Sequence, residues 1–238
     1  MRLSIVIPAY NEASRLPATL EVLKNLIDER ALQWTIGEVL VVNDGSTDGT
    51  KEYIEKVSKQ WTLIRPISLP QNQGKGAAVH RGLRESREEF VLIADADMAT
   101  PWPEMNKFLP DVSQYDLLMG SRALPQSEIV VRQHWVRQNM GRTFNKILKG
   151  IVGLKFHDTQ CGFKLLKITN VVRGKVIPQL RVNRFAWDVE LILLMQDEKL
   201  QIKEVPVRWE HKEESHVRLF RDSWEMFCTV LKLRLGLF

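Results

Sequence analysis

Two aspartates, Asp95 and Asp97, are separated by one residue and directly follow the apolar run of residues 90–94. Carboxylate oxygens are the ligands that Mg²⁺ and Mn²⁺ prefer, and such a pair usually binds the cation together with a substrate phosphate. Aspartates at this spacing also occur as residues that solvate a turn or cap a helix. Their position at the end of a predicted buried strand, where a charge without a partner is costly, favours a site for a divalent cation and a ribose hydroxyl.

A second polar segment, residues 43–49, surrounds Asp44. Asp44 and the glycine after it are typical of a turn, and Thr47 or Asp48 is a typical cap for the following helix. Asp44 also lies at a predicted strand end, where its carboxylate is placed to accept from a base N–H or a ribose hydroxyl. Glu12, at the predicted start of the first helix, has two alternative roles. Its carboxylate complements the helix dipole, or it contacts a ligand.

A third segment, residues 72–78, places Lys75 between glycines at the predicted start of a helix. Glycines permit close backbone approach, and a helix N-terminus with a lysine is a favourable position for a phosphate or a nucleotide. The same glycines also serve the packing of a helix on a sheet. This segment alone therefore leaves the two interpretations open.

Short apolar runs alternate with stretches of helical period between these polar segments. The alternation is typical of βαβ units and predicts an α/β fold, with a mainly parallel, buried sheet flanked by helices. The strands are expected at residues 3–7, 38–42, 63–69, 90–94, 116–120 and 201–209. The helices are expected at residues 13–29, 48–60, 74–87 and 185–197.

The polar residues all follow predicted strands, and Arg122 follows the fifth one. In an open sheet of this kind the ligand lies beyond the carboxyl ends of the strands. Carboxylates, amides and one guanidinium from four strand ends are therefore expected to face a common crevice.

Residues 129–156 contain no acidic side chain, and basic residues are interspersed there with apolar ones. This pattern predicts a basic amphipathic helix or helix pair, and residues 219–238 show a second amphipathic segment. Such helices lie at a membrane interface, or they pack on the sheet or form the contact of a homo-oligomer. The absence of acidic residues favours the membrane for residues 129–156, whereas the alternatives are evenly balanced for residues 219–238.

The chain of 238 residues is 44% hydrophobic and 26% charged, so it can bury a core and is expected to form one domain over residues 1–238. Its formal net charge of +5 indicates an anionic partner. No groove-binding motif accompanies the basic residues, which argues against nucleic acid. No stretch reaches the ~20 apolar residues of a membrane span. The two cysteines are far apart and indicate a reducing cytosol.

Taken together and in this order, the polar segments resemble the family 2 glycosyltransferases, which have the GT-A fold. The segments that match the donor-site pattern of that family are residues 8–12, 42–48, 72–77 and 95–97. A narrower resemblance points to the dolichyl-phosphate glucosyltransferase branch, with polyprenyl-phosphate mannosyltransferases as a more distant likeness. The segments that carry it are residues 120–122, 158–164 and 185–190.

The resemblance implies that a hexose, glucose in the first instance, moves with inversion from a nucleotide diphosphate sugar, UDP-glucose, to a polyprenyl or dolichyl phosphate. Asp95 and Asp97 would bind a divalent cation, Mg²⁺ or Mn²⁺, at the donor phosphates. The implied donor-binding residues are Pro8, Tyr10, Glu12, Asp44, Asn72, Lys75, Asp95 and Asp97. Residues 1–122 would form the donor half and residues 123–238 the acceptor half, attached peripherally to the cytoplasmic face of a membrane through amphipathic helices.

An acceptor phosphate is largely ionised at neutral pH, because its second pKa is near ~6, and it requires no general base. It requires positive charge that positions it against the donor. The residues expected to give this charge are Arg122, Arg137, Arg142 and Lys164, and for Arg137 and Arg142 a solvated helix face is an equal alternative. The expected catalytic residues are Asp97, Arg122 and Asp188.

Two other functions remain open from the sequence. A sugar or protein hydroxyl acceptor would need a base, for which Asp188 is the candidate. A non-catalytic module that binds a membrane surface is the third alternative, and the complete set of donor-site carboxylates argues against it.

Overall fold

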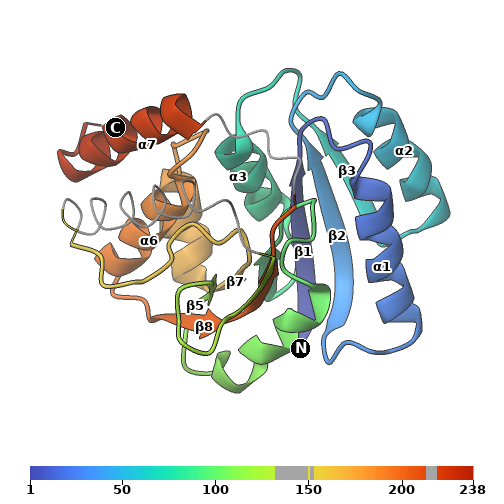
Figure 1. Ribbon diagram of the computed structural model, residues 1–238, viewed down its shortest axis with the longest axis horizontal. Coiled ribbons are helices and arrows are strands. Elements are labelled where there is room, and N and C mark those ends of the chain that lie inside the picture. The colour runs from blue at the N-terminus through green and yellow to red at the C-terminus, as the bar shows by residue number, and fades with distance from the viewer. Residues whose placement is uncertain (132–149, 151–152, 213–218, 238) are drawn as a thin grey trace.

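A computed structural model of the protein describes residues 1–131, 150, 153–212 and 219–237. Its main sheet has seven strands: β1 (Arg2–Ala9), β2 (Thr35–Asn43), β3 (Ile64–Ser68), β4 (Phe90–Ile93), β5 (Leu117–Ser121), β7 (Lys164–Lys167) and β8 (Ile202–Pro206). Their order across the sheet is β3-β2-β1-β4-β7-β5-β8 (Figure 1). All neighbouring strands are parallel except β7, which is antiparallel to both β4 and β5.

Helices cover both faces of this sheet (Figure 1). They are α1 (Leu16–Asp28), α2 (Thr50–Gln60), α3 (Lys75–Glu85), the 3₁₀ helix η1 (Trp102–Asp111), the π-helix η2 (Val172–Val176), α5 (Ile177–Gln179), α6 (Trp187–Asp197) and α7 (Leu219–Arg234). Two further short strands, β6 (Glu128–Val131) and β9 (Arg208–Glu210), pair in parallel beside the main sheet.

Strand β1, in the interior of the sheet, is buried on both faces because its side chains alternate between two apolar clusters. Ile5 and Ile7 belong to the cluster that contains side chains of α1 and η1. Val6 belongs to the second cluster, which contains side chains of α3 and α6. This double burial explains why the sequence of β1 is a continuous apolar run.

The predicted strands of the first half and the four predicted helices are all present, with ends that differ from the expected ones by a few residues. The predicted strand over residues 201–209 is wrong in one respect, because the chain leaves the main sheet at Val207 and continues as β9. The predicted helix over residues 129–156 is wrong at both ends. Residues 129–131 belong to β6, and residues 153–156 are neither helix nor strand. The rest of that segment, except Gly150, lies outside the described residues.

The predicted amphipathic segment near the C-terminus forms α7, which lies beside α6 (Figure 1). Val230 of α7 is buried in the second cluster, whereas Trp224 and Leu231 are exposed. Among the helices of the described residues, none is long and apolar enough to span a membrane. Both cysteines, Cys161 and Cys228, are free thiols.

Candidate active site

Asp44, directly after β2, anchors the loop that leads into α3. Its carboxylate accepts hydrogen bonds from the Asn72 side-chain amide (2.9 Å) and from the backbone N–H groups of Gln73 (2.8 Å) and Gly74 (2.8 Å). Burial raises the pKa of Asp44, although the bonds from Gln73 and Gly74 oppose this. Asp44 therefore fixes the position of the helix start that carries Lys75.

Glu12 lies just before α1 and is held by Arg15. The Arg15 guanidinium donates two hydrogen bonds to the Glu12 carboxylate, at 2.7 and 2.6 Å. The backbone N–H of Glu12 donates to the Thr50 hydroxyl (2.8 Å), which joins the end of β1 to the start of α2. Of the predicted donor-site residues just before Glu12, Pro8 is buried within β1, and Tyr10, at the end of this strand, is 38% exposed.

Asp95 and Asp97 lie on a tight turn that follows β4. Helix α1 supports this turn, because the Thr19 hydroxyl donates to the Ala96 carbonyl (2.6 Å). The backbone N–H of Ala99 donates to Asp97 Oδ1 (3.0 Å). Burial and the neighbouring charge of Asp95 raise the pKa of Asp97. The two carboxylates thus repel each other, and a cation shared between them would relieve that repulsion.

Lys75, the first residue of α3, forms an ion pair with Asp95. Asp95 Oδ1 faces this ammonium but accepts no hydrogen bond of normal geometry from the described residues. Burial disfavours the charged form of Lys75, but the charges of Asp95, Asp97 and Asp188 outweigh it and raise the pKa of the lysine. Three carboxylates, two from the turn after β4 and one from α6, therefore act on one ammonium group.

The carboxylate pair fits a hard divalent cation. Oxygen ligands suit Mg²⁺ and Mn²⁺, which commonly bind through one or two carboxylates and complete their shell with water and substrate phosphates. Among the residues that the structure describes, no group of three or more His, Cys, Asp and Glu side chains is arranged to hold a metal ion. A cation held by these two carboxylates would take its remaining ligands from water and from substrate phosphates.

Arg122, directly after β5, is clamped by Asp158. Its guanidinium donates to both oxygens of the Asp158 carboxylate, at 2.6 and 2.9 Å, and its backbone N–H donates to the same carboxylate at 3.0 Å. Although burial opposes ionisation, Arg122 lowers the pKa of Asp158 to about 2. The guanidinium carbon also lies 5.4 Å from the centroid of the Trp209 ring. Arg122 is thus a fixed positive charge with 28% of its side chain exposed.

Lys164 lies beneath the site and has no exposed surface. Its ammonium donates to the carbonyl of Cys161 and lies 5.4 Å from the centroid of the Trp187 ring. Burial opposes the ionisation of Asp95, but Lys75, Lys164 and Arg122 together lower its pKa. Lys164 is therefore a buried positive charge that favours the ionised form of Asp95.

Asp188 lies in the first turn of α6 and is buried. Burial raises its pKa, although the positive charges of Lys164 and Lys75 oppose this. Glu190, two residues later, points elsewhere: its carboxylate accepts from the backbone N–H groups of Arg181 and Val182, both at 2.9 Å. Glu190 thus holds the loop before α6, against which the start of α3 packs.

Close backbone contact brings α3 and α6 together. A Cβ atom on Gly76 would lie 2.1 Å from the carbonyl oxygen of Val182, and the backbone N–H of Ala77 donates to the Asn183 carbonyl (2.9 Å). Gly74 has a φ of +110°, which favours glycine. Gly74 and Gly76 thus serve the packing of α3 against the loop before α6, and not the packing of a helix on the sheet that one of the two interpretations predicted. This packing brings Lys75 within electrostatic reach of Asp188.

A family model described as "Glycosyl transferase family 2" matches residues 4–169. Curated relatives named dolichyl-phosphate β-glucosyltransferase match almost the whole chain. The relative from Dictyostelium discoideum is 34% identical over 98% of this chain and 73% of its own length. The relative from Homo sapiens is 33% identical over 98% of this chain and 75% of its own length. The chain belongs to glycosyl transferase family 2.

Solved structures confirm the predicted GT-A fold of this family 2 glycosyltransferase. Mannosyl-3-phosphoglycerate synthase from Rubrobacter xylanophilus matches with a TM-score of 0.71 at 19% identity, over 99% of this chain and 74% of the other. A mannosyltransferase from Pyrobaculum calidifontis, solved with GDP-Man and Mn²⁺, matches with a TM-score of 0.54 at 17% identity, over 90% of this chain and 58% of the other.

Several of the predicted site residues of this family 2 glycosyltransferase lie together in the structure. Lys75 contacts Asp95, Asn72 contacts Asp44, and Asp188 lies within electrostatic reach of Lys75. Arg137 and Arg142 fall outside the described residues, so their contact with an acceptor stays a prediction. Lys164 is placed differently from the expectation, because a side chain without exposed surface does not present its ammonium to an acceptor in this conformation.

The sequence did not single out Arg15 or Asp158 of this family 2 glycosyltransferase as site residues. Arg15 binds Glu12, and Asp158 binds Arg122. Asp158 begins the segment 158–164 that carries part of the family resemblance, so that motif was the available signal for it. Arg15 lies three residues after Glu12, a spacing that favours an ion pair at the start of a helix.

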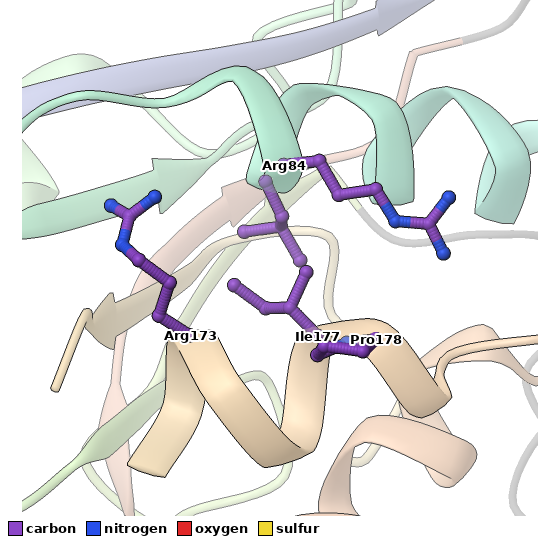
Figure 2. A pocket seen from close by; sticks show the side chains of 5 residues that line it. Arg84, Arg173, Ile177 and Pro178 are labelled. Carbon is purple, nitrogen blue, oxygen red and sulfur yellow. The ribbon is translucent and has the colours of Figure 1, made fainter. Parts of the chain in front are cut away.

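A separate hollow of about 350 Å³ lies between the C-terminal end of α3 and the segment formed by η2 and α5 (Figure 2). It is lined by Leu83, Arg84, Arg173, Ile177 and Pro178. None of the predicted site residues lines it. This hollow is therefore separate from the charged residues that follow the strands of the main sheet.

Proposed function

We propose that this protein transfers a glucosyl group from UDP-glucose to the phosphate of a dolichol-type polyprenyl phosphate, with inversion at the anomeric carbon. The observation that carries the proposal is that the carboxylates of Asp95 and Asp97 follow β4, while the guanidinium of Arg122, fixed by Asp158, follows β5 two strands along the sheet and acts on the charge of Asp95. The curated relatives that match nearly the whole chain bear the corresponding name.

On the donor side, Asp95 and Asp97 would hold a divalent cation, Mg²⁺ or Mn²⁺. When bound, the cation would supply Lewis-acid stabilisation of the leaving nucleotide diphosphate. Lys75 lies beside this pair and is placed to contact a donor phosphate. The residues after β1 and the loop anchored by Asp44 would hold the nucleoside.

On the acceptor side, a phosphate oxygen is already ionised at neutral pH and needs no base. Arg122 would orient it, because its guanidinium is fixed by Asp158 and stacked on Trp209 while part of it stays exposed. Lys164 adds a second positive charge to this part of the protein, although its side chain is fully buried. Fixed charge of this kind costs little reorganisation when the acceptor binds.

The lipid tail of such an acceptor stays in a bilayer, so the protein would have to work at a membrane surface. Helix α7 supports this part of the proposal, because it exposes Trp224 and Leu231 near Lys232 and Arg234, and Leu235 is exposed directly after it. An aromatic and aliphatic face beside basic residues is suited to the interface of an anionic membrane. We propose the cytoplasmic face of that membrane as the place of action.

A second candidate function is transfer to a hydroxyl group with Asp188 as the general base. The raised pKa of the buried Asp188 favours it. In that case Asp188→Asn should abolish turnover while UDP-glucose binding persists. With a phosphate acceptor, Asp188→Asn should keep at least a tenth of the wild-type turnover.

A donor screen tests the proposal. The protein is incubated with Mn²⁺, a short polyprenyl phosphate and labelled UDP-glucose, UDP-N-acetylglucosamine or GDP-mannose, and the label in the organic extract is counted. We expect transfer from UDP-glucose above the other two donors. Transfer to soluble hydroxyl acceptors without transfer to the lipid would overturn the proposed acceptor.

A further inference from the structure

The ion pair between Lys75 and Asp95 joins two residues that the proposed function uses separately. Asp95 belongs to the carboxylate pair that would hold the divalent cation, and Lys75 is expected at a donor phosphate. In the structure the Lys75 ammonium faces Asp95 Oδ1, an oxygen that accepts no hydrogen bond of normal geometry within the described part of the chain. The ammonium therefore occupies one side of a carboxylate that is expected to bind metal.

Asp95 itself has little freedom to turn away from this position. A Cβ atom on Gly162 would lie 2.1 Å from Asp95 Oδ2, so this oxygen is packed directly against the glycine backbone. The backbone is also held, because the Asp95 carbonyl accepts a hydrogen bond from the N–H of Met98 (3.3 Å). If one partner of the ion pair has to move, it is the lysine.

Lys75 has the freedom that Asp95 lacks. Its side chain is a flexible four-carbon stem, whereas Asp95, which is about equally exposed (34% against 32% for Lys75), has a short side chain that packs against Gly162. Its backbone is fixed at the start of α3, where the loop before α6 packs against it. The ammonium can therefore change partners while its attachment point stays in place, and the charges of Asp97 and Asp188 keep it within the site.

We propose that Lys75 is an internal counter-cation that neutralises Asp95 before the divalent cation arrives, and that it leaves Asp95 for a donor phosphate when cation and nucleotide sugar bind. The second half of this inference rests on the proposed function. Through this exchange Asp95 always has a positively charged partner, first the Lys75 ammonium and then the divalent cation. It also delivers a cation to the donor phosphates at the moment they enter.

The proposal predicts opposite effects of one substitution on two ligands. Removing the ammonium frees Asp95, so Mn²⁺ alone should bind more tightly. The same change removes a phosphate contact, so UDP-glucose should bind more weakly in the presence of Mn²⁺. A purely structural lysine would weaken both ligands or neither.

The experiment titrates Mn²⁺ into wild type, Lys75→Met, Lys75→Arg and the remote control Lys51→Met, and follows free Mn²⁺ by electron paramagnetic resonance. We expect Lys75→Met to bind Mn²⁺ about fivefold more tightly, the factor that corresponds to the ~1 kcal/mol of a partly exposed ion pair. Lys75→Arg and Lys51→Met should match wild type. Equal or weaker Mn²⁺ binding by Lys75→Met would overturn the proposal, provided that its circular dichroism spectrum shows the folded protein.

A measurement on the wild-type protein covers the case in which Lys75→Met does not fold. Acetic anhydride labelling of Lys75, read by mass spectrometry, should rise when Mn²⁺ is added and fall when UDP-glucose follows. Labelling that ignores Mn²⁺ would contradict the exchange. If Mn²⁺ raises the labelling but UDP-glucose neither lowers it nor binds any variant, the counter-cation inference stands and the proposed donor is wrong.

Discussion

The carboxylate of Asp95 lies directly against the backbone of Gly162, so closely that a Cβ atom on the glycine would stand 2.1 Å from Asp95 Oδ2. The two residues come from the turn after β4 and from the segment just before β7, which pairs with β4 in the sheet. The absence of a side chain at Gly162 therefore sets where one of the two carboxylates proposed to hold the cation can lie.

Gly162→Ala should displace the Asp95 carboxylate and reduce Mn²⁺ affinity and transferase activity by at least about tenfold, since every 1.4 kcal/mol lost is a factor of ten. Mn²⁺ titration and the lipid-extraction assay measure the two effects. Gly174→Ala is the matched control, because a Cβ there meets no atom within 4 Å. Wild-type Mn²⁺ affinity in Gly162→Ala would show that the contact does not position Asp95.

Asp158→Asn should destabilise the fold, because it leaves Arg122 without the carboxylate that its guanidinium and backbone bind. Breaking a buried ion pair by removing one partner costs about 3 kcal/mol or more. Urea unfolding measures the loss. Lys175→Met removes an exposed pair with Glu198 and should cost less than ~1 kcal/mol. If both substitutions lower the free energy of unfolding by the same amount, the ion pair between Arg122 and Asp158 does not stabilise the fold more than an exposed pair.

His80 should make the protein less stable in mild acid. It is buried in α3, and burial together with the positive charge of Arg84 lowers its pKa to about 4. The unfolded chain, with a histidine pKa near ~6.5, takes up the proton first, so stability falls as the pH drops from about 6.5 to 4.

Between pH 7 and pH 5 the free energy of unfolding should fall by up to about 2 kcal/mol because of His80, and His80→Gln should remove this fall. Urea unfolding at both pH values gives the comparison. His211→Gln should retain the wild-type difference. If His80→Gln loses as much stability as wild type between the two pH values, His80 is not the cause.

Local periodicity predicted most of the fold, because β1, β2 and β4 are buried on both faces and leave continuous apolar runs in the sequence. It did not predict β7, whose four residues begin and end with lysine. Nor did it predict β6, three of whose four residues are apolar and which pairs with β9 almost 80 residues later in the chain. Short strands that depend on distant partners carry no periodic signal of their own.

The composition of the site was predictable, and its internal partners were not. Asp95 and Asp97 stand out because carboxylates follow a buried strand. The pairing of Lys75 with Asp95 depends on how α3 packs on β1 and β2, and the pairing of Arg122 with Asp158 joins residues 36 positions apart in the chain. Such contacts follow from the register of the sheet, which spacing in the sequence does not specify.

The most direct test of the account is the transfer of labelled glucose from UDP-glucose to a short polyprenyl phosphate, measured with Mn²⁺ for wild type, Asp97→Asn and the exposed control Asp28→Asn. A cation at Asp97, as proposed, would supply several kcal/mol of charge stabilisation, so Asp97→Asn should lower the rate on the order of 100-fold or more. Asp28→Asn should transfer glucose at the wild-type rate. Full activity of Asp97→Asn, or no lipid-linked glucose from wild type, would contradict the account.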